Sequence, residues 1–379
     1  MPPGGYGSGW RAGRATDESV RPDSGAEETG QVNRHFVALS GLAIVIVVLN
    51  HSIHMGTLGI QEMGLPQAKG LERLLLVLLS GLGTFAVPTF LFTSGSFASY
   101  AAQRTPLRLP WSNVWAALKR LLWPYLIWSI VFYIYIYFRK AEAYTLWGYI
   151  TNLIVGYPFH FVPILLFYYA CSPVLVRLTR RFGYALLAGI ALYQAFLTGL
   201  VFPSTFGLTV PDWTGILVPP VLGQPMAQWG IYFPLGLVYS LKAKEISPWL
   251  QRLRIVLAMT TGAFFVLLVL NDIGFLRFPL AYYMCPLVFL LFAPTIRRDS
   301  IPLVRHLEKV ARRSYGLYLT NLLVLDSCVV SAQILVPGLL AYPLVFCLIL
   351  FAVALAVPLG VVSGVARSPA RVVYHYLFG

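Results

Sequence analysis

Three polar side chains, Asn50, His51 and His54, stand near the end of a long apolar run. The run begins at His35 and is about as long as a helix that crosses a bilayer. Ionisable groups inside hydrocarbon are costly, so they usually face a bundle interior or a cavity with a function. Histidine exchanges protons near neutral pH, which suits a general base. The alternative is an interhelical hydrogen bond that only stabilises the bundle.

The composition indicates an integral membrane protein. Of 379 residues, 58% are hydrophobic and 11% are charged, whereas soluble domains have about 45–50% and about 25%. A soluble core could not bury so much apolar surface. The cysteines lie in apolar segments without metal-like spacing, which indicates small core residues and no disulfides; they are Cys171, Cys285, Cys328 and Cys347.

The expected fold is all-α, a bundle of about ten transmembrane helices between two tails. Residues 1–33 are rich in Gly, Pro, Ser and mixed charges, which predicts a disordered cytoplasmic tail and no signal peptide. Residues 34–362 form the transmembrane domain, and 363–379 a basic cytoplasmic tail. The ten apolar segments lie near 36–56, 74–98, 115–138, 147–176, 184–202, 226–241, 253–271, 278–294, 314–334 and 338–362. Prolines interrupt the fourth, whose spanning part is expected to begin near Phe159.

The distribution of Lys and Arg supports this count. With both termini in the cytoplasm, 23 of the 28 basic residues fall on cytoplasmic segments, which is the positive-inside pattern. The net charge of +14 then orients the chain and contacts anionic lipid, and it does not call for nucleic acid. The amphipathic basic segment 297–313 is expected to be an interfacial helix. We expect a multi-pass protein of a cell membrane, the plasma membrane of a bacterium.

The helical rise places several ionisable groups in the outer half of the bilayer. At 1.5 Å per residue, His51 lies ~22 Å and Asp326 ~18 Å above the inner surface. Asp272 ends the seventh segment and His160 begins the spanning part of the fourth, both at the outer face. Asp272 also fits a solvated residue at a helix end. Depth alone does not establish contact.

Five stretches resemble, in order, the membrane acyltransferase-3 family. They are 41–51, an apolar run that ends in histidine; 87–95, with Pro and a final Ser-Gly; 119–125, a basic pair before Pro-Tyr; 229–236, with Tyr-Phe and Gly; and 314–319, Ser-Tyr-Gly-Leu-Tyr-Leu. The likeness covers about residues 34–362. It implies a membrane-embedded enzyme that acylates cell-surface glycans or small molecules.

Three positions depart from the family pattern. The family arginine eleven residues before the histidine is Ser40 here, and the aspartate three residues earlier is Val37. The late motif often continues with His, where this chain has Asn321. Arg34 could replace the missing charge only from ~10 Å nearer the cytoplasmic surface. The departures indicate either another donor-binding residue or loss of activity.

The chemistry that the resemblance implies is transfer of an acyl group, acetyl first, from acyl-coenzyme A to a hydroxyl. Such a reaction needs a base and donors for the oxyanion. His51 is the expected base, with His54 near it and Asp326 or Asp272 fixing its tautomer. Asn50, His160 and Asp272 are expected to contact substrate. No Gly-x-Ser-x-Gly motif occurs, and the spacing from His51 to His54 is not that of a zinc protease. We therefore expect no bound cofactor and no metal.

The donor is expected to bind from the cytoplasm. Lys119 and Arg120 suit the phosphates of coenzyme A by charge, although anchoring to lipid headgroups fits them equally. The acceptor, a glycan, lipid-linked sugar or small molecule, would arrive outside, where segment 203–224 carries Asp212, Trp213 and several prolines but no Lys or Arg. Two other functions stay open: a polytopic transporter or exporter, and an inactive member of the same fold.

Overall fold

The computed structural model describes residues 24–103 and 110–379, with side chains from Arg34 onward, and within these ranges the chain is helical without strands. Several 3₁₀ turns join the α-helices. The helices are α1 (Ser24–Glu62), α2 (Gly70–Gly81), α3 (Ala86–Gln103), α4 (Trp111–Lys140), α5 (Leu146–Val155), α6 (Phe161–Val201), α7 (Gly223–Trp229), α8 (Tyr232–Leu241), α9 (Ala243–Asp272), α10 (Ala281–Phe292), α11 (Val304–Ala311), α12 (Ser314–Leu335), α13 (Pro343–Arg367) and α14 (Tyr374–Phe378).

Long apolar helices dominate the chain. Within the described ranges, seven are long and apolar enough to cross a membrane, counting Gly70–Gln103 as one, and three shorter apolar helices accompany them. Exposed apolar side chains such as Ile130, Ile134, Ile255 and Val266 line α4 and α9. In water such surfaces would associate, whereas in a bilayer they contact lipid tails. The chain is a multi-pass membrane protein.

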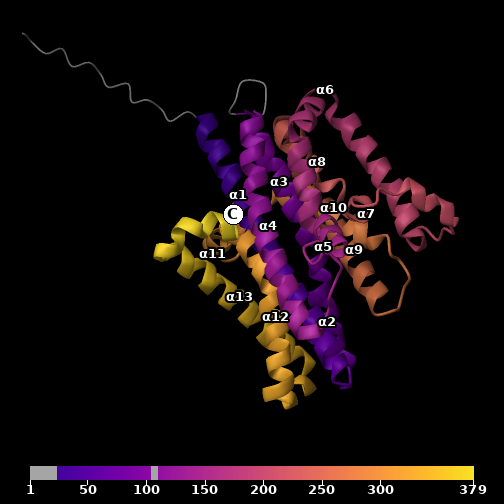
Figure 1. Cartoon of the computed structure of the whole chain (residues 1–379). Helices are drawn as coiled ribbons and strands as arrows, with labels where there is room; N and C mark the ends of the chain where they lie inside the picture. The colour runs from indigo at the N-terminus through magenta and orange to yellow at the C-terminus, as the bar shows by residue number, and fades with distance from the viewer. Residues whose placement is uncertain (1–23, 104–109) are drawn as a thin grey trace, which may run out of the picture.

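Helix α6 is a bent pair of arms. It has 41 residues, or about 60 Å at 1.5 Å per residue, twice the ~30 Å thickness of the hydrocarbon core. Phe182 interrupts it with non-helical angles, φ −133° and ψ 26°, and Figure 1 shows the two arms diverging from the bend. The sequence predicts two separate segments there, 147–176 and 184–202. The kink at Phe182 divides α6 into two helical arms at the boundary between those two segments, and the structure also separates α5 from α6, which begins at Phe161.

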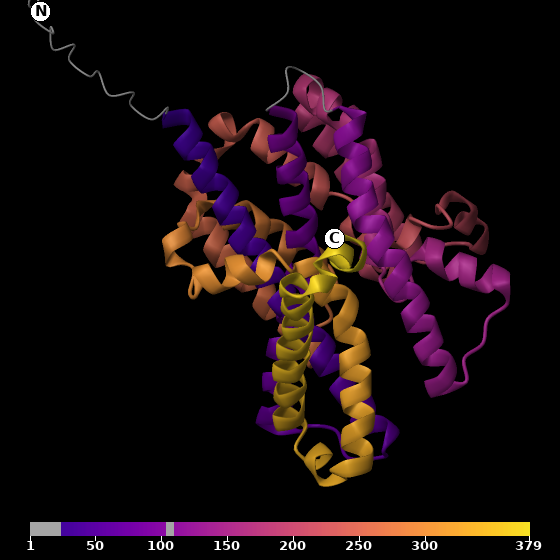
Figure 2. The ribbon, with the colours of Figure 1, turned by 60° about the vertical axis from the view of Figure 1, so that its left-hand side comes forward.

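Helix α1 is the axis of the bundle. It contacts α3, α11, α12 and α13, and Figures 1 and 2 show it running along the bundle with α12 and α13 side by side near its far end. The end at which α3 ends and α4 begins carries Lys119 and Arg120, and we call it the basic end. Helix α1 ends and α2 begins at the opposite end.

Helices α3 and α8 cross with their backbones in close approach. A Cβ atom on Gly95 would collide with the backbone oxygen of Phe233, and one on Gly236 would collide with the backbone oxygen of Phe92. Small residues let two backbones approach where no hydrophobic force acts between helices in lipid. Both glycines belong to stretches that carry the family resemblance, so these stretches form packing contacts as well as any site.

Both expected tails differ in part from the structure. Residues 1–23 of the predicted tail 1–33 lie outside the described residues, and 24–33 are not disordered but form the first turns of α1. At the other end α13 continues past 362 to Arg367, and α14 folds back on α4. The indole nitrogen of Trp128 donates to the backbone oxygen of Leu377 at 2.8 Å, so 363–379 is packed structure. In the predicted interfacial segment 297–313, the helix is restricted to α11, which packs on α1.

Candidate functional site

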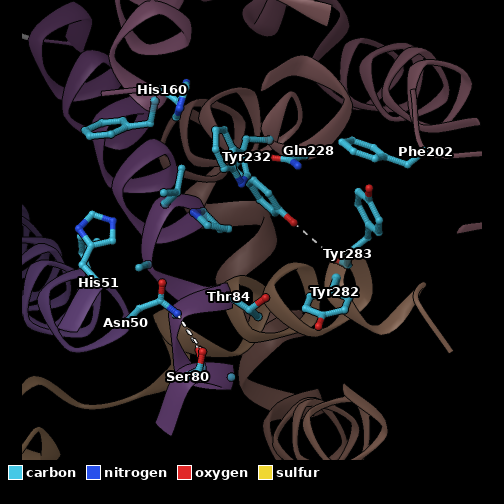
Figure 3. A pocket seen from close by; sticks show the side chains of 18 of the residues that line it. Asn50, His51, Ser80, Thr84, His160, Phe202, Gln228, Tyr232, Tyr282 and Tyr283 are labelled. Carbon is cyan, nitrogen blue, oxygen red and sulfur yellow. Dashed lines mark hydrogen bonds between the residues drawn. The ribbon is translucent and has the colours of Figure 1, made fainter. Parts of the chain in front are cut away.

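A cavity of ≈ 590 Å³ with both polar and apolar lining lies among α1, α3, α6, α8, α10 and α12, and we call it the central cavity. It brings together four predicted site residues, Asn50, His51, His160 and Asp272, from α1, the start of α6 and the end of α9. Figure 3 shows His51 and Asn50 on one wall, with Phe202 and Tyr283 across from them. Three of the five ionisable residues expected in the outer half of the bilayer, His51, His160 and Asp272, line this cavity.

A buried amide sets the proton position on His51. Nδ1 of His51 lies 2.9 Å from Oδ1 of Asn321 on α12. Nδ2 of Asn321 donates to the backbone oxygens of Leu317 and Tyr318, at 3.0 and 2.7 Å. Carbonyl oxygens only accept, so the amide NH₂ must face them and Oδ1 must face the imidazole. Nδ1 then carries the hydrogen, and Nε2 keeps its lone pair as a base.

The Asn50 side chain is hydrogen-bonded to Ser80, near the end of α2 and just before the break between α2 and α3. Its Nδ2 donates to the backbone oxygen of Ser80 at 3.0 Å and lies 3.3 Å from the Ser80 hydroxyl, as drawn in Figure 3. The chain changes to a 3₁₀ turn at Leu82–Phe85 between α2 and α3. A Cβ atom on Gly83 would collide with the Asn50 side chain. Glycine at this turn therefore lets α1 approach and keeps His51 at the cavity.

The far wall is a set of tyrosines. The Tyr282 hydroxyl donates to a carboxylate oxygen of Asp272, and the Tyr232 hydroxyl donates to the backbone oxygen of Tyr283 at 3.4 Å. Asp272 is therefore a cavity residue with a hydroxyl partner. It makes no hydrogen bond or ion pair with His51, and the role of fixing the imidazole goes to Asn321.

His160 lies at one mouth of the central cavity, immediately before α6. Partial burial lowers the pKa of its imidazole below the ordinary value because desolvation disfavours the charged form. His160, Gln228 and Trp229 also line a second cavity of ≈ 620 Å³, which the segment before α7 lines as well and which we call the outer cavity. The described part of the chain offers no hydrogen-bond partner to the Gln228 side-chain amide.

A third cavity of ≈ 250 Å³, the inner cavity, lies towards the basic end. Arg120, Ser94, Ser314 and Tyr315 line it. It shares two residues with the central cavity, Phe161 and Tyr318, whose rings meet edge to face at 4.5 Å between centroids. We call this pair the aromatic partition. Only these two residues line both cavities among those the structure describes.

Three predicted site residues, His54, Lys119 and Asp326, line none of the three cavities. His54 is exposed and lines none of the three cavities. Lys119 is exposed and places its ammonium 5.4 Å from the ring centre of Trp115, so only its neighbour Arg120 reaches the inner cavity.

Asp326 does not meet His51, contrary to the pairing considered from sequence. Its carboxylate accepts from the Tyr135 hydroxyl at 2.6 Å and lies 3.9 Å from Nε of Arg139, both on α4. Its side chain is 13% exposed and that of Arg139 is 35% exposed. This carboxylate fastens α12 to α4.

Ser40, at the position of the missing arginine, is a packing residue. It is 8% exposed, and its hydroxyl lies 2.9 Å from Thr93 Oγ1 and 3.1 Å from the backbone oxygen of Phe36. The contact with Thr93 joins α1 to α3, and the bond to Phe36 lies within α1. A serine hydroxyl thus fills this position inside the bundle, and no cation is present there to attract an anionic donor.

Sequence reasoning missed three residues of the site. Asn321 was noted only as a departure from the family pattern, and Tyr318 only as part of a motif. Gln228 precedes one quoted stretch and drew no attention. The one available signal was their polarity inside apolar segments, which also marks ordinary interhelical contacts.

No cluster of three or more His, Cys, Asp or Glu side chains suited to a metal ion occurs within 24–103 and 110–379. The polar groups that line the central cavity are two imidazoles, one carboxylate, amides, hydroxyls and phenols. Such groups suit proton transfer from a hydroxyl.

A multi-pass helical bundle with a half-buried histidine at a cavity is compatible with a membrane-embedded enzyme. A family model described as an acyltransferase domain, Acyl_transf_3, matches residues 38–361, nearly the whole chain. The chain therefore belongs to the acyltransferase-3 family and is a membrane acyltransferase. No curated protein and no solved structure matches it.

Proposed function

We propose that this enzyme transfers an acyl group, acetyl first, from acyl-coenzyme A to a hydroxyl of a glycan, lipid-linked sugar or small-molecule acceptor. The observation that carries the proposal is the His51–Asn321 contact, because it leaves a neutral base at the wall of the central cavity. We further propose ten membrane spans with both termini cytoplasmic, which puts the basic end inside and the outer cavity outside.

In the proposed reaction Nε2 of His51 removes the proton of the acceptor hydroxyl while its oxygen attacks the thioester carbonyl. The new C–O bond forms as the carbonyl becomes an oxyanion. The carbonyl then re-forms, the C–S bond breaks, and the coenzyme A thiolate leaves with the proton that His51 returns. The protein binds the two substrates and moves one proton, so no bound cofactor or metal is needed.

The donor would occupy the inner cavity. Arg120 at this cavity supplies a cation for the coenzyme A phosphates, and the remaining lining, with Leu121, Leu165 and Phe90, suits the neutral pantetheine arm. The thioester would reach the central cavity at the aromatic partition, where Tyr318 also lies 6.5 Å from the His51 ring centre. Ring rotation of Phe161 and Tyr318 would open this contact.

The test compares cells that carry the gene with cells that carry His51→Ala. Mass spectrometry of surface glycans and lipids should show an added acyl group only with the unaltered gene. Purified enzyme should then consume acetyl-coenzyme A in proportion to that product. Accumulation of an unmodified substrate across a vesicle membrane, without use of acetyl-coenzyme A, would instead establish the transporter.

Binding gives a check that is independent of turnover. Acetyl-coenzyme A should raise the melting temperature of the purified protein, because a ligand that binds only the folded state stabilises it. The His51→Ala variant should show the same rise, since the base does not hold the donor. Absence of the rise in both proteins would contradict donor binding.

A further inference from the structure

The outer cavity is a second binding-sized space beside the reaction site. Its volume of ≈ 620 Å³ falls within the range of about 300–1,000 Å³ that small-molecule sites occupy. Its walls come from the ends of α5 and α6, from the segment between α6 and α7, and from α7 itself. The reaction proposed above uses only its border with the central cavity.

Side-chain bonds fix the wall that separates the two cavities. The Thr198 hydroxyl of α6 donates to the backbone oxygen of Ala227 at 2.8 Å. Gln194 donates to the backbone oxygen of Gln228 at 3.2 Å and accepts from the amide of Ile231 at 2.7 Å. These bonds fasten α7 and the start of α8 to α6. Gln228 and Trp229 are thereby held where the cavities meet.

Hydrogen bonds also constrain the segment between α6 and α7. The amide of Gly223 donates to the backbone oxygen of Pro219 at 2.9 Å, and the Thr214 hydroxyl donates to that of Pro211 at 2.7 Å. Proline fixes φ and removes a donor, which reduces the freedom of the chain around it. The cavity is therefore formed before any ligand arrives, and its lining chemistry selects what enters.

That lining is apolar and without formal charge, apart from the titratable His160. No Asp, Glu, Lys or Arg occurs among the described residues that line it. Four valines and three prolines form most of its surface, and they are Val155, Val201, Val218, Val221, Pro219, Pro220 and Pro225. Polar contacts come from Gln224, Gln228, His160 and the Trp229 indole. A charged ligand would lose its hydration here without gaining a counter-charge, which is costly.

We propose that the outer cavity binds the acceptor, and that this acceptor is an uncharged amphiphilic alcohol: a hydroxyl-bearing ring with an apolar substituent. The apolar substituent would pack on the valines and prolines. The polar ring would lie against Trp229, with Gln228 and His160 contacting its hydroxyls as one of them enters the central cavity towards His51. This inference rests on the proposed acyl transfer, and it excludes acidic sugars as good acceptors.

A matched pair of acceptors tests the charge rule. Octyl β-glucoside and octyl β-glucuronide share the ring, the chain and the three ring hydroxyls, and they differ at C6, where a carboxylate replaces the primary alcohol; the comparison is therefore made for acylation of the ring hydroxyls. With enzyme in lipid nanodiscs and acetyl-coenzyme A as donor, kcat/KM for the glucoside should exceed that for the glucuronide at least tenfold.

Two lysine variants distinguish the effect of a charge inside the outer cavity from the effect of the same charge on the nearby surface. Gln224→Lys places a cation in the lining, and Thr209→Lys places the same charge on an exposed position of the same segment outside that lining. Gln224→Lys should reduce the preference for the glucoside several-fold, and Thr209→Lys should leave it unchanged. Equal use of both acceptors by the unaltered enzyme, or equal effects of the two variants, would overturn the inference.

Photocrosslinking tests binding at the outer cavity separately from the proposed acyl transfer. An octyl glucoside with a diazirine in its chain, irradiated without acetyl-coenzyme A, should label peptides that contain residues 215–225. Excess octyl glucoside should prevent the labelling and octyl glucuronide should not. Labelling without any acetyl transfer would reject the proposed function and retain the site. Transfer without labelling of these peptides would reject the site and retain the function.

Discussion

Nδ1 of His51 lies 2.9 Å from the side-chain oxygen of Asn321, which is fully buried on α12. The contact joins the first long helix to a late one, and it assigns the imidazole hydrogen without any carboxylate. A neutral amide in place of an acidic partner adds no charge to the centre of a membrane protein. It holds His51 by geometry alone, since the Asn321 amide is itself fixed by two backbone carbonyls.

The first prediction concerns the base. His51→Ala should lower the rate of acyl transfer by about 10²–10⁴-fold, the usual cost of losing a general base, while the protein still folds. His54→Ala is the matched control because it removes a histidine one turn away that lines no described cavity. Initial rates with purified proteins measure both, and a His51→Ala enzyme near the normal rate would eliminate this base.

The second prediction concerns Asn321. Replacement by Leu should lower kcat by at least tenfold, because His51 loses the acceptor that holds Nδ1–H and its tautomers can then interchange. Asn321→Asp keeps an acceptor oxygen and should retain more activity than Asn321→Leu, although it loses the two bonds to backbone carbonyls. Equal rates for the two variants at equal folded concentration would show that the contact does not orient the base.

The third prediction separates Arg120 from Lys119. Arg120→Ala should raise KM for acetyl-coenzyme A about tenfold, because a charged hydrogen bond contributes about 1.5 kcal/mol and about 1.4 kcal/mol is a factor of ten. Lys119→Ala should leave KM near normal, since Lys119 lies over Trp115. Acetyl-pantetheine lacks the nucleotide phosphates, so its KM should not respond to either change. A rise for both donors would mean a structural effect.

The fourth prediction concerns orientation in the membrane. A reporter fused after Phe202 or Leu335 should read outside, and one fused after Arg104 or Gly379 should read inside. A single cysteine at Tyr184, just past the bend of α6, should react with an impermeant reagent only from the cytoplasmic side in a variant without native cysteines. An outside signal at Tyr184 would contradict both the ten-span count and the hairpin formed by α6.

Apolar length and basic residues were enough to predict the class of fold. Runs of about 20 apolar residues must form helices in lipid, because every backbone group needs a partner there. The bend at Phe182 was also foreseeable as a boundary, since Arg177, Arg180 and Arg181 precede it. What the composition did not reveal was that no loop separates the two arms, which meet at Phe182.

Contacts between helices could not be predicted from the sequence, because they depend on the direction in which each side chain points around its helix axis. Asn321 and Asp326 are both polar residues of α12, but at 100° per residue they point about 140° apart. Only the packing of α1 and α4 on either side decides which of them meets His51. The helical rise gives depth alone, so it placed Asp326 at a level similar to that of His51 although the two side chains point to different neighbours.

Asp326 gives a further prediction, in which stability and rate should separate. Asp326→Asn removes the charge that faces Arg139 and the strong acceptor for Tyr135, so the melting temperature should fall. The transfer rate per folded molecule should stay near normal, because this carboxylate lies outside the central cavity. Arg139→Gln in the same chain should recover part of the lost stability by removing the unpaired cation. A large loss of kcat with unchanged stability would show that Asp326 takes part in catalysis.

His160 gives a prediction on pH, through the burial that lowers its pKa. In the unfolded chain histidine titrates near about 6.5, so below that pH the unfolded form takes up a proton that the folded form resists. The His160 contribution is neutral above that range and destabilises the fold progressively as the pH falls through it. His160→Gln should therefore reduce the loss of melting temperature between about pH 7 and pH 5, while the difference between the two proteins should be constant above about pH 7.5. Parallel curves across the whole range would show that His160 keeps its ordinary affinity for protons in the folded enzyme.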